Sequence, residues 1–448
     1  MKKMGIAIAL LVGMAAQPVF AWGNHSLAAY RAFEKMPEVA NAPMVTVETL
    51  ESFLRAEETT LEALLASQEA WATANLEKYP ARPAMLAFKA DAAQSDEARR
   101  LAFLMALRVA PNAKLALYYQ PDPLNPTALG PILPYGAVNT LPEPLKYTQK
   151  FIALKPGDTL PALAVLASAS DEPDYGLDIN LWQDSPSDWG KVYGFGTLPF
   201  GNPALSYSTQ APFHMGFMHE NRVLYMAAPF IKRTFPLLRS YQYSSLAALA
   251  FRSGHPYWGW RFTGLSLHYL QDLTQPYHAS LAPGDSTLKL IAANALAMAG
   301  MPQTKDNMVV LLSNRHLALE KYQTELLAAA AAAKRDTALE QSLRNQNKDR
   351  SYPEWNDRYV RDVVSAQSAA AGTTLASTLV ATMPPGYVSD PAFDFGVKED
   401  TIDLSAELAK RDPADRARLE AAIAELMGNF GAHSRNEVRG ILRANPQP

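Results

Sequence analysis

The sequence predicts an all-α protein. Helical spacing of apolar residues recurs along the chain, alanine is abundant in those stretches, and strand-like alternation is scarce and short. The chain has 448 residues, which is more than the roughly 100–200 residues of a usual domain. One large domain, or two smaller ones, can therefore bury a substantial core.

Five stretches carry the helical pattern. In the first, Leu27, Tyr30 and Phe33 share one face, which predicts an amphipathic helix. The fourth contains an alanine run followed by mixed charges, as in a long helix with a solvated face. In the fifth, Asp412 precedes Pro413, an arrangement typical of a capped helix start. The predicted helices cover residues 26–35, 47–76, 96–109, 326–347 and 412–426.

Two segments break the helical pattern. Residues 120–144 contain seven prolines, too many for a helix, and are expected to form an extended connection or a surface arm. Residues 189–218 are rich in glycine, proline and aromatic residues. That composition fits either an ordered loop over a core or a wall that faces a substrate.

The N-terminus has the pattern of a bacterial-type secretory signal. Lys2 and Lys3 precede an uncharged apolar stretch, and Val19 and Ala21 supply small residues at the −3 and −1 positions of a cleavage site. The stretch is too short for a membrane-spanning anchor, which is the alternative interpretation. We expect cleavage after Ala21, which removes residues 1–21 and leaves a secreted or periplasmic protein that begins at Trp22. No later stretch predicts a transmembrane segment.

The composition limits the kinds of site that the chain can build. The formal charge is -3 and the isoelectric point about 6.3, so no overall charge favours a stable nucleic-acid partner or an anionic membrane. The absence of cysteine excludes disulfides, thiol catalysis and thiolate metal ligands. A metal must therefore use histidine, aspartate and glutamate, and the positions of the eight histidines matter.

One stretch of the sequence is dense in candidate metal ligands. His268 and Asp272 are four residues apart, so a helix places both side chains on one face, where they can share a cation. Pro276 is expected to end that helix, and the turn can bring His278 back beside the pair.

A second pair with the same spacing lies at His316 and Glu320. One such pair is more often a simple hydrogen bond. Two pairs and a third histidine together predict a metal site whose nitrogen and oxygen ligands suit zinc, and also iron or manganese.

The string Gly-Leu-Ser-Leu-His-Tyr-Leu-Gln-Asp-Leu-Thr-Gln-Pro-Tyr-His-Ala at 264–279 resembles the signature of the zinc-dependent phospholipases C, whose relatives are the single-strand-specific zinc nucleases. Further motifs carry the same resemblance. Members begin, after signal removal, with Trp and a nearby His, then have a Pro-Asp-Tyr, another His and a His-x-x-x-Glu pair. The matching residues here are Trp22, His25, Asp174 in Pro173-Asp174-Tyr175, His214, His316 and Glu320.

The resemblance implies a multi-helical fold with three zinc ions. The first zinc would be held by Asp174, His214, His268 and Asp272; the second by the free amine and carbonyl of Trp22 with His25 and Asp272; the third by His278, His316 and Glu320. Two assignments stay open at this point. His219 competes with His214, and Asp171 and Asp178 compete with Asp174.

The activity that the resemblance implies is hydrolysis of phosphatidylcholine-like lipids, at a membrane or micelle surface, to diacylglycerol and a phosphorylated head group. A metal-bridging hydroxide would attack phosphorus, and Asp174 would also accept a proton as general base. Tyr175 is expected to contact the head group through a cation–π interaction. The alternative is a tyrosine that simply packs beside a buried site.

The chain also departs from the family's pattern. Asp174 and His214 are 40 residues apart, farther than in compact members. Residues 38–160 are expected to be a helical and proline-rich insertion, and residues 385–448 a C-terminal helical extension, within one catalytic domain of residues 22–448. The aromatic stretch 256–262 runs into the signature helix and is expected to pack in the core rather than to act as a membrane wedge.

Two other functions stay open. The first is a zinc-dependent single-strand nuclease or 3′-nucleotidase built on the same cluster. Two features favour the phospholipase: the Ser-Leu-His-Tyr-Leu residues of the signature, and Glu320 at a position where the nucleases usually have Asp. The second is a non-catalytic helical protein with structural zinc, for which we would expect a closed site of four protein ligands. The oligomeric state is left open.

Overall fold

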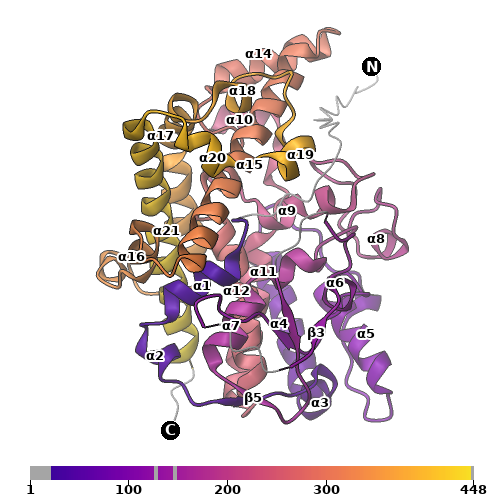
Figure 1. Cartoon of the computed structure of the whole chain (residues 1–448). Coiled ribbons are helices and arrows are strands. Elements are labelled where there is room, and N and C mark those ends of the chain that lie inside the picture. The colour runs from indigo at the N-terminus through magenta and orange to yellow at the C-terminus, as the bar shows by residue number, and fades with distance from the viewer. Residues whose placement is uncertain (1–21, 126–129, 145–148, 445–448) are drawn as a thin grey trace, which may run out of the picture.

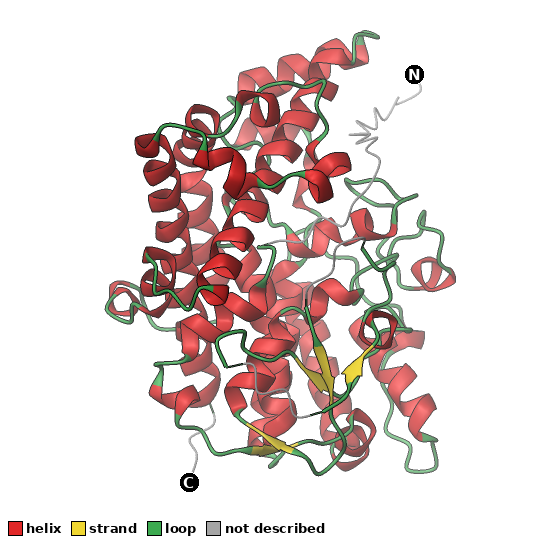
Figure 2. Ribbon diagram, viewed as in Figure 1, coloured by secondary structure: helices red, strands yellow, loops and turns green. Residues whose placement is uncertain are grey.

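The computed structural model describes residues 22–125, 130–144 and 149–444. The expected signal peptide, residues 1–21, lies outside this part of the chain. The described residues are mostly helical, and their strands are only two or three residues long, so the predicted all-α class is confirmed (Figures 1 and 2). In the described part of the chain, no helix is both long enough and apolar enough to span a bilayer.

The N-terminal part of the described chain is helical, and within it α3 packs against α4 and α5. The helix predicted over 26–35 is confirmed as α1, but every residue of α1 is buried, so its second face is covered rather than exposed as an amphipathic helix would have it. The single helix predicted over 47–76 is two helices, because the chain turns at Glu57. The helices are α1 (His25–Phe33), α2 (Pro37–Ala40), α3 (Leu50–Ala56), α4 (Glu58–Asn75) and α5 (Asp96–Leu107).

The described chain contains two small antiparallel sheets, both drawn in the lower half of the molecule in Figure 2. β1 (Val45–Thr46) pairs with β5 (Thr159–Leu160), and β4 (Phe151–Ala153) lies between β2 (Tyr118–Tyr119) and β3 (Ile132–Leu133). The proline-rich segment enters this second sheet. Its described residues are extended, as predicted, apart from turns and one short helix, α6 (Tyr135–Val138).

The aromatic segment 189–218 forms an ordered loop over a core. Phe195 and Phe213 are buried and pack against Trp182 and Phe235, with the Trp182 and Phe213 ring centroids 5.5 Å apart. For Phe195 and Phe213, the interpretation as an ordered loop over a core therefore holds, rather than the interpretation as a wall that faces a substrate. The segment includes α8 (Asp188–Val192), the 3₁₀ helix η3 (Ser206–Gln210) and α9 (Ala211–His214).

The centre of the molecule is α12 (Pro256–Asp272), in which every residue from Tyr257 onward is buried. It packs against α11 (Pro236–Arg252), α7 (Ala162–Ser170) and α21 (Pro413–Arg443). The aromatic residues at its start belong to the hydrophobic core, so the prediction of core packing for 256–262 is confirmed.

The predicted helix over 326–347 is wrong at its centre. The alanine run is the end of α15 (Gln303–Ala332) rather than the start of a helix. Lys334 then takes a positive φ of 49°, and Thr337 starts a new helix, α16 (Ala338–Arg344), with a capping box that includes Glu340.

The remaining helices of the C-terminal half complete the fold. Asp412 caps α21 as predicted, by accepting a hydrogen bond from Ala414 N, but the helix continues well past residue 426. Its second half is buried against α1, α12 and α16. The other helices are α10 (Arg222–Ala227), α13 (Pro276–Ala279), α14 (Thr287–Met298), the π-helix η6 (Val360–Ser365), α17 (Ala366–Thr382), α18 (Pro385–Val388), α19 (Phe395–Lys398) and α20 (Leu404–Ala409).

Candidate metal centre

The close approach of α12 and α7 positions the first pair of candidate ligands. A Cβ at Gly264 would lie only 2.4 Å from the carbonyl oxygen of Leu166, so glycine is required where the two helices touch. One turn later, the Ser170 carbonyl oxygen lies 2.7 Å from His268 Nδ1. This contact fixes the imidazole so that Nε2 faces Asp272, the last residue of α12.

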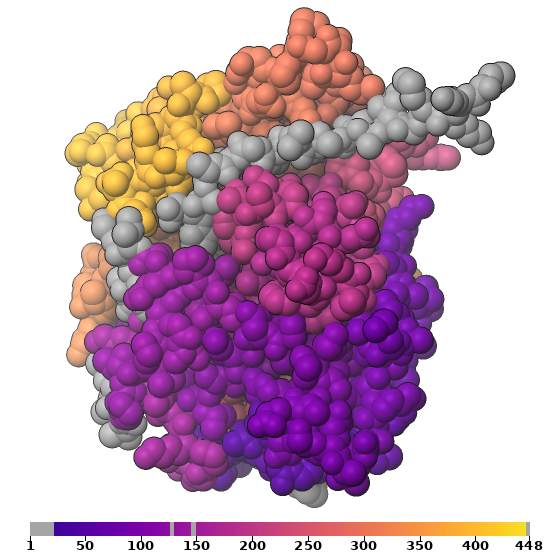
Figure 3. All heavy atoms as spheres, turned by 90° about the vertical axis from the view of Figure 1, so that its right-hand side faces the viewer, coloured from indigo at the N-terminus to yellow at the C-terminus, as the bar shows by residue number. Residues whose placement is uncertain are grey.

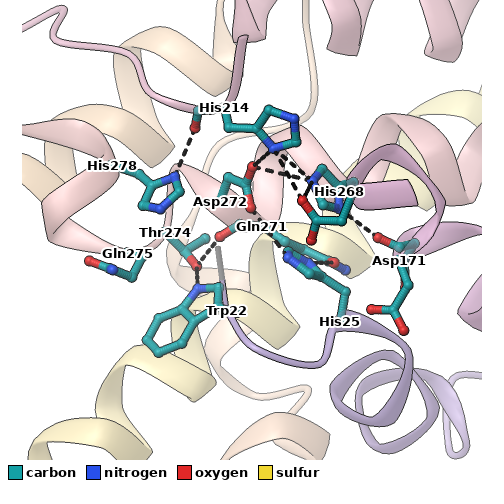
Figure 4. Close-up of polar contacts among 12 residues, drawn as sticks. Trp22, His25, Asp171, His214, His268, Gln271, Asp272, Thr274, Gln275 and His278 are labelled. Atoms are coloured by element: carbon teal, nitrogen blue, oxygen red, sulfur yellow. Dashed lines mark hydrogen bonds and ion pairs between the residues drawn. The ribbon is translucent and has the colours of Figure 1, made fainter. Parts of the chain in front are cut away.

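Three groups of buried histidine and carboxylate side chains converge at this end of α12. Figure 4 labels five of these residues, His25, His214, His268, Asp272 and His278. In the first group, His25 Nε2 lies 3.3 Å from Asp272 Oδ1. The other ring nitrogen of His25 is 2.8 Å from Gln271 Oε1, which orients the ring. His268 completes this group.

The second group consists of Asp174, His214 and His268. His214 Nδ1 lies 3.0 Å from His268 Nε2 and 2.9 Å from Asp272 Oδ2. Asp174 Oδ1 is 3.8 Å from His214 Nδ1 and 3.7 Å from His268 Nε2. Asp272 therefore turns one oxygen to the first group and the other to the second.

The third group consists of His278, His316 and Glu320. His316 Nε2 lies 2.6 Å from Glu320 Oε1 and 3.0 Å from His278 Nε2. The other nitrogen of His278 is 2.9 Å from the His214 backbone oxygen, which ties this group to the second (Figure 4).

Trp22 contacts the turn that follows α12. Its indole Nε1 donates to Thr274 Oγ1 at 3.0 Å, and the side chain is fully buried (Figure 4). A Cβ at the next residue, Gly23, would lie 2.3 Å from Thr324 Oγ1 and 3.5 Å from the Glu320 carbonyl oxygen. The chain at residues 22–23 thus runs past the helix that carries Glu320.

The charges of the site raise the pKa of two histidines. Burial opposes protonation of both rings, but the hydrogen bond and charge of Asp272 raise the pKa of His25 to about 9. Hydrogen bonds to Asp178 and Asp272 raise the pKa of His214 to about 10. Burial, with the neighbouring charge of Asp272, raises the pKa of Asp174 to about 7. The enclosed carboxylates therefore attract positive charge, which protons or metal cations can supply.

Several buried polar atoms at the centre lack a well-formed hydrogen bond to the described residues. His25 Nε2 and Asp272 Oδ1 approach each other only to 3.3 Å, His214 Nε2 lies 3.5 Å from Asp178, and Glu320 Oε2 has no hydrogen-bond partner among the described residues. An unpaired buried polar atom is destabilising, and metal ligation would relieve that cost for those atoms that face a cation. The nitrogen and oxygen donors fit zinc, and also iron or manganese. The three buried groups could therefore bind metal ions.

The alternative ligands lie elsewhere or have other partners. Asp178 accepts from Arg239 Nε at 2.8 Å and from the Tyr269 hydroxyl at 2.6 Å, and it faces His214 Nε2 from 3.5 Å. Asp171 accepts from Ser26 N and Gln120 Nε2.

Two further residues that the sequence singled out lie outside the three groups. His219 is exposed, and its Nε2 is 2.8 Å from the Arg361 carbonyl oxygen. Tyr175 is buried in an aromatic cluster, with its ring centroid 5.4 Å from that of Phe151, and its hydroxyl accepts from Gln120 Nε2 at 3.0 Å. These are the contacts of a packed tyrosine.

Four residues that support the ligands were missed from the sequence. Arg239 holds Asp178 behind His214. Gln271 orients His25, and Gln275 Nε2 donates to Glu320 Oε1 at 2.9 Å. Tyr269 donates to Asp178. Three of these residues lie inside the 264–279 string, which could have indicated a role at the site: Tyr269, Gln271 and Gln275. Nothing in the sequence indicates such a role for Arg239.

Comparisons of this chain with protein-family models, with curated proteins and with solved structures give no match.

Proposed function

We propose that this protein is a zinc-dependent phosphodiester hydrolase of the phospholipase C type, acting on phosphatidylcholine-like lipids. The observation that carries the proposal is the convergence of three buried groups of ligands, two of which face opposite oxygens of Asp272. The resemblance of residues 264–279 to the phospholipase signature gives the reaction class. Trp22, with the amine freed by cleavage after Ala21 in the exported protein, would hold one ion together with His25 and Asp272. Asp174, His214, His268 and Asp272 would hold another, and His278, His316 and Glu320 the third.

Bound zinc would lower the pKa of water and neutralise phosphate charge. The residues of the chain would do the rest. Asp174, buried and 3.5 Å from Gln210 Nε2, would accept the proton of the attacking water. Gln271, Gln275 and Asp178 would hold His25, Glu320 and His214 in fixed orientations, so that little reorganisation accompanies the reaction.

Two observations support a lipid rather than a nucleic acid. The chain has no basic excess, whereas nucleic-acid affinity depends on neutralising phosphates with basic residues. In addition, an apolar cavity reaches His214, His278 and His316, which suits a phosphodiester that carries an apolar group.

The test is turnover of phosphatidylcholine in mixed micelles beside turnover of single-stranded DNA. The mature protein is used as purified, after chelation, and after chelation followed by added zinc. We expect diacylglycerol release that chelation abolishes and zinc restores, with little cleavage of DNA. Preferential cleavage of DNA would instead make the protein a nuclease, and no metal-dependent turnover of either substrate would contradict the proposal.

A further inference from the structure

An apolar cavity of about 270 Å³ opens beside the third ligand group. Its walls come from parts of the chain that are far apart in sequence: the 200–217 segment, α10, α14 and the first half of α15. Figure 1 places α10, α14 and α15 together at the upper end of the molecule. On the face in Figure 3, the part of the chain around residue 200 lies below α14.

The helical walls of the cavity are mainly aliphatic. Leu224 contributes from α10, Leu290 and Ala293 from α14, and Val309 and Leu312 from α15. The opposite wall includes Phe200, Leu205 and Phe217, and the Phe200 and Phe217 rings pack together at a centroid distance of 5.4 Å. Most of the surface that a bound group would meet is therefore apolar.

The end of the cavity lies at the metal centre. His214 from the second ligand group, and His278 and His316 from the third, are part of its lining. A molecule with its phosphate at these histidines would thus have an apolar substituent in contact with α10, α14 and α15. The cavity and the ligand groups together define an amphiphilic binding site.

The helices that line the cavity also expose large apolar side chains on their outer surfaces. Met226 on α10 is 67% exposed, and Leu288 and Met298 on α14 are 79% and 57% exposed. Exposed apolar side chains that gather on neighbouring elements suit contact with an apolar phase. This feature favours an acyl chain over a nucleobase as the occupant of the cavity.

We propose that this cavity binds one acyl chain of the substrate and so sets the preference of the enzyme for the apolar part of its phosphodiester. The proposal rests on the proposed function. The aliphatic side chains of α10, α14 and α15 supply the contact, and each methylene of the substrate that enters contributes about 0.8 kcal/mol, close to a fourfold gain in affinity.

The experiment uses soluble alkyl p-nitrophenyl phosphodiesters with methyl, butyl and octyl chains, below the concentrations at which they aggregate. The mature protein is loaded with zinc, and kcat/KM is measured from p-nitrophenolate release. We expect kcat/KM to rise at least about tenfold from methyl to octyl. Thymidine 5′-(p-nitrophenyl phosphate) serves as the substrate with a nucleobase in place of the chain.

Two variants fill the cavity from different helices. Ala293→Trp projects from α14, where Ala293 is 2% exposed, and Ala228→Phe comes from the chain just after α10, where Ala228 is 6% exposed. The matched control is Ala295→Trp, on the exposed face of α14. We expect both filling variants to lose the dependence on chain length while their zinc content and melting temperature stay close to those of wild type. The control should behave as wild type.

The outcomes separate this inference from the proposed function. Absence of turnover of even the methyl ester would mean that the phosphodiesterase proposal has failed. Turnover without chain-length dependence, or folded filling variants that keep that dependence, would overturn the acyl-chain site alone. A preference for the thymidine ester that the filling variants abolish would assign the cavity to a nucleobase instead.

Discussion

Asp272 is the residue on which the centre depends most. One carboxylate oxygen faces His25 at 3.3 Å, and the other lies 2.9 Å from His214 and 3.4 Å from His268. Burial alone would raise the pKa of this carboxyl, but the charge of His268 and the hydrogen bonds from His214 and His25 hold the pKa well below its usual range. A carboxylate that stays ionised in full burial suits a ligand shared by two cations.

The hydroxyl of Tyr269 stabilises this arrangement from outside. It donates to Asp178 Oδ2 at 2.6 Å, and Asp178 faces His214. We predict that Tyr269→Phe lowers stability by about 1–3 kcal/mol, as expected for a lost hydrogen bond to a charged acceptor, and weakens metal binding by about 10-fold. Denaturant unfolding and titration against a chelator measure the two effects.

The control for this variant is Tyr243→Phe. Tyr243 is also buried, and its ring stacks on Tyr269 at a centroid distance of 6.0 Å. It should lose little metal affinity. Equal affinity in the two variants would refute the role given to the Tyr269 hydroxyl.

At the level of single residues, spacing alone indicates some ligands and not others. The i,i+4 pairs at 268/272 and 316/320 follow from helix geometry, and the structure places both pairs in ligand groups. By contrast, spacing does not separate Asp171, Asp174 and Asp178, and only the motif around Asp174 favours that residue. What distinguishes Asp178 is Arg239, which is 61 residues away and satisfies its carboxylate. Local patterns carry no information on a partner at that separation.

Among the elements, the contact between α7 and α12 controls the geometry of His268. We predict that Gly264→Ala pushes the helices apart, since the added Cβ would lie 2.4 Å from Leu166 O and 2.6 Å from Ala169 Cβ. Overpacking of this kind typically destabilises by about 1–3 kcal/mol. The Ser170 contact to His268 should be lost with it, so zinc content should fall along with the melting temperature.

Gly386→Ala provides the comparison for Gly264→Ala. Gly386 lies in the short helix α18, and a Cβ there would meet nothing within 4 Å. That variant should be as stable as wild type or slightly more stable. If Gly264→Ala were equally harmless, the close approach of α7 and α12 would not be what positions His268.

The contact between α12 and α21 should depend on pH. Glu437 of α21 is fully buried against Ser266, and burial raises its pKa to about 8 from an ordinary 4.5. The folded state therefore keeps this proton in a range where the unfolded chain has lost it. Stability from this group is present below about pH 4.5 and is lost as the pH rises toward 8, by at most about 1.4 kcal/mol per pH unit.

The variant Glu437→Gln stays neutral and tests this dependence. We predict that it loses less stability than wild type between about pH 5 and pH 8, as measured by urea unfolding at several pH values. Glu425→Gln, an exposed position on the same helix, should follow the wild-type curve. Parallel curves for wild type and Glu437→Gln would contradict a buried neutral acid at this position.

The sequence predicts more readily that a helix forms than where the helix ends or which of its faces are buried. Asp412 marks a cap that the structure contains. The helix breaks after Ala332 because the chain turns at Lys334 and a new helix is capped by Thr337. The strong helix propensity of the alanine run predicted a continuous helix across this break. Complete burial of α1 arises because α7, α16 and α21 all cover it, which no local period reveals.

Across the whole molecule, segments from both ends of the described chain meet at the candidate metal centre. α1 brings His25, and α21 brings Ser434, which accepts from Gln271 at 3.1 Å while Gln271 contacts His25. The predicted C-terminal extension, residues 385–448, thus supplies a residue that helps to hold the candidate ligand His25. The motifs can be recognised in the sequence. Their arrangement around the site depends on tertiary packing between distant segments, which the sequence patterns do not show.

The most direct test of the central claim is the metal content of the mature protein, measured beside Asp272→Asn and the control Asp188→Asn, whose side chain is 97% exposed. We predict close to three zinc ions per chain in wild type and in the control, the number implied by the three ligand groups. Asp272→Asn should retain the ion at His278, His316 and Glu320 and lose the ions that share Asp272, together with the proposed phosphodiesterase activity. Wild-type protein with no bound metal, or full occupancy in Asp272→Asn, would contradict the account.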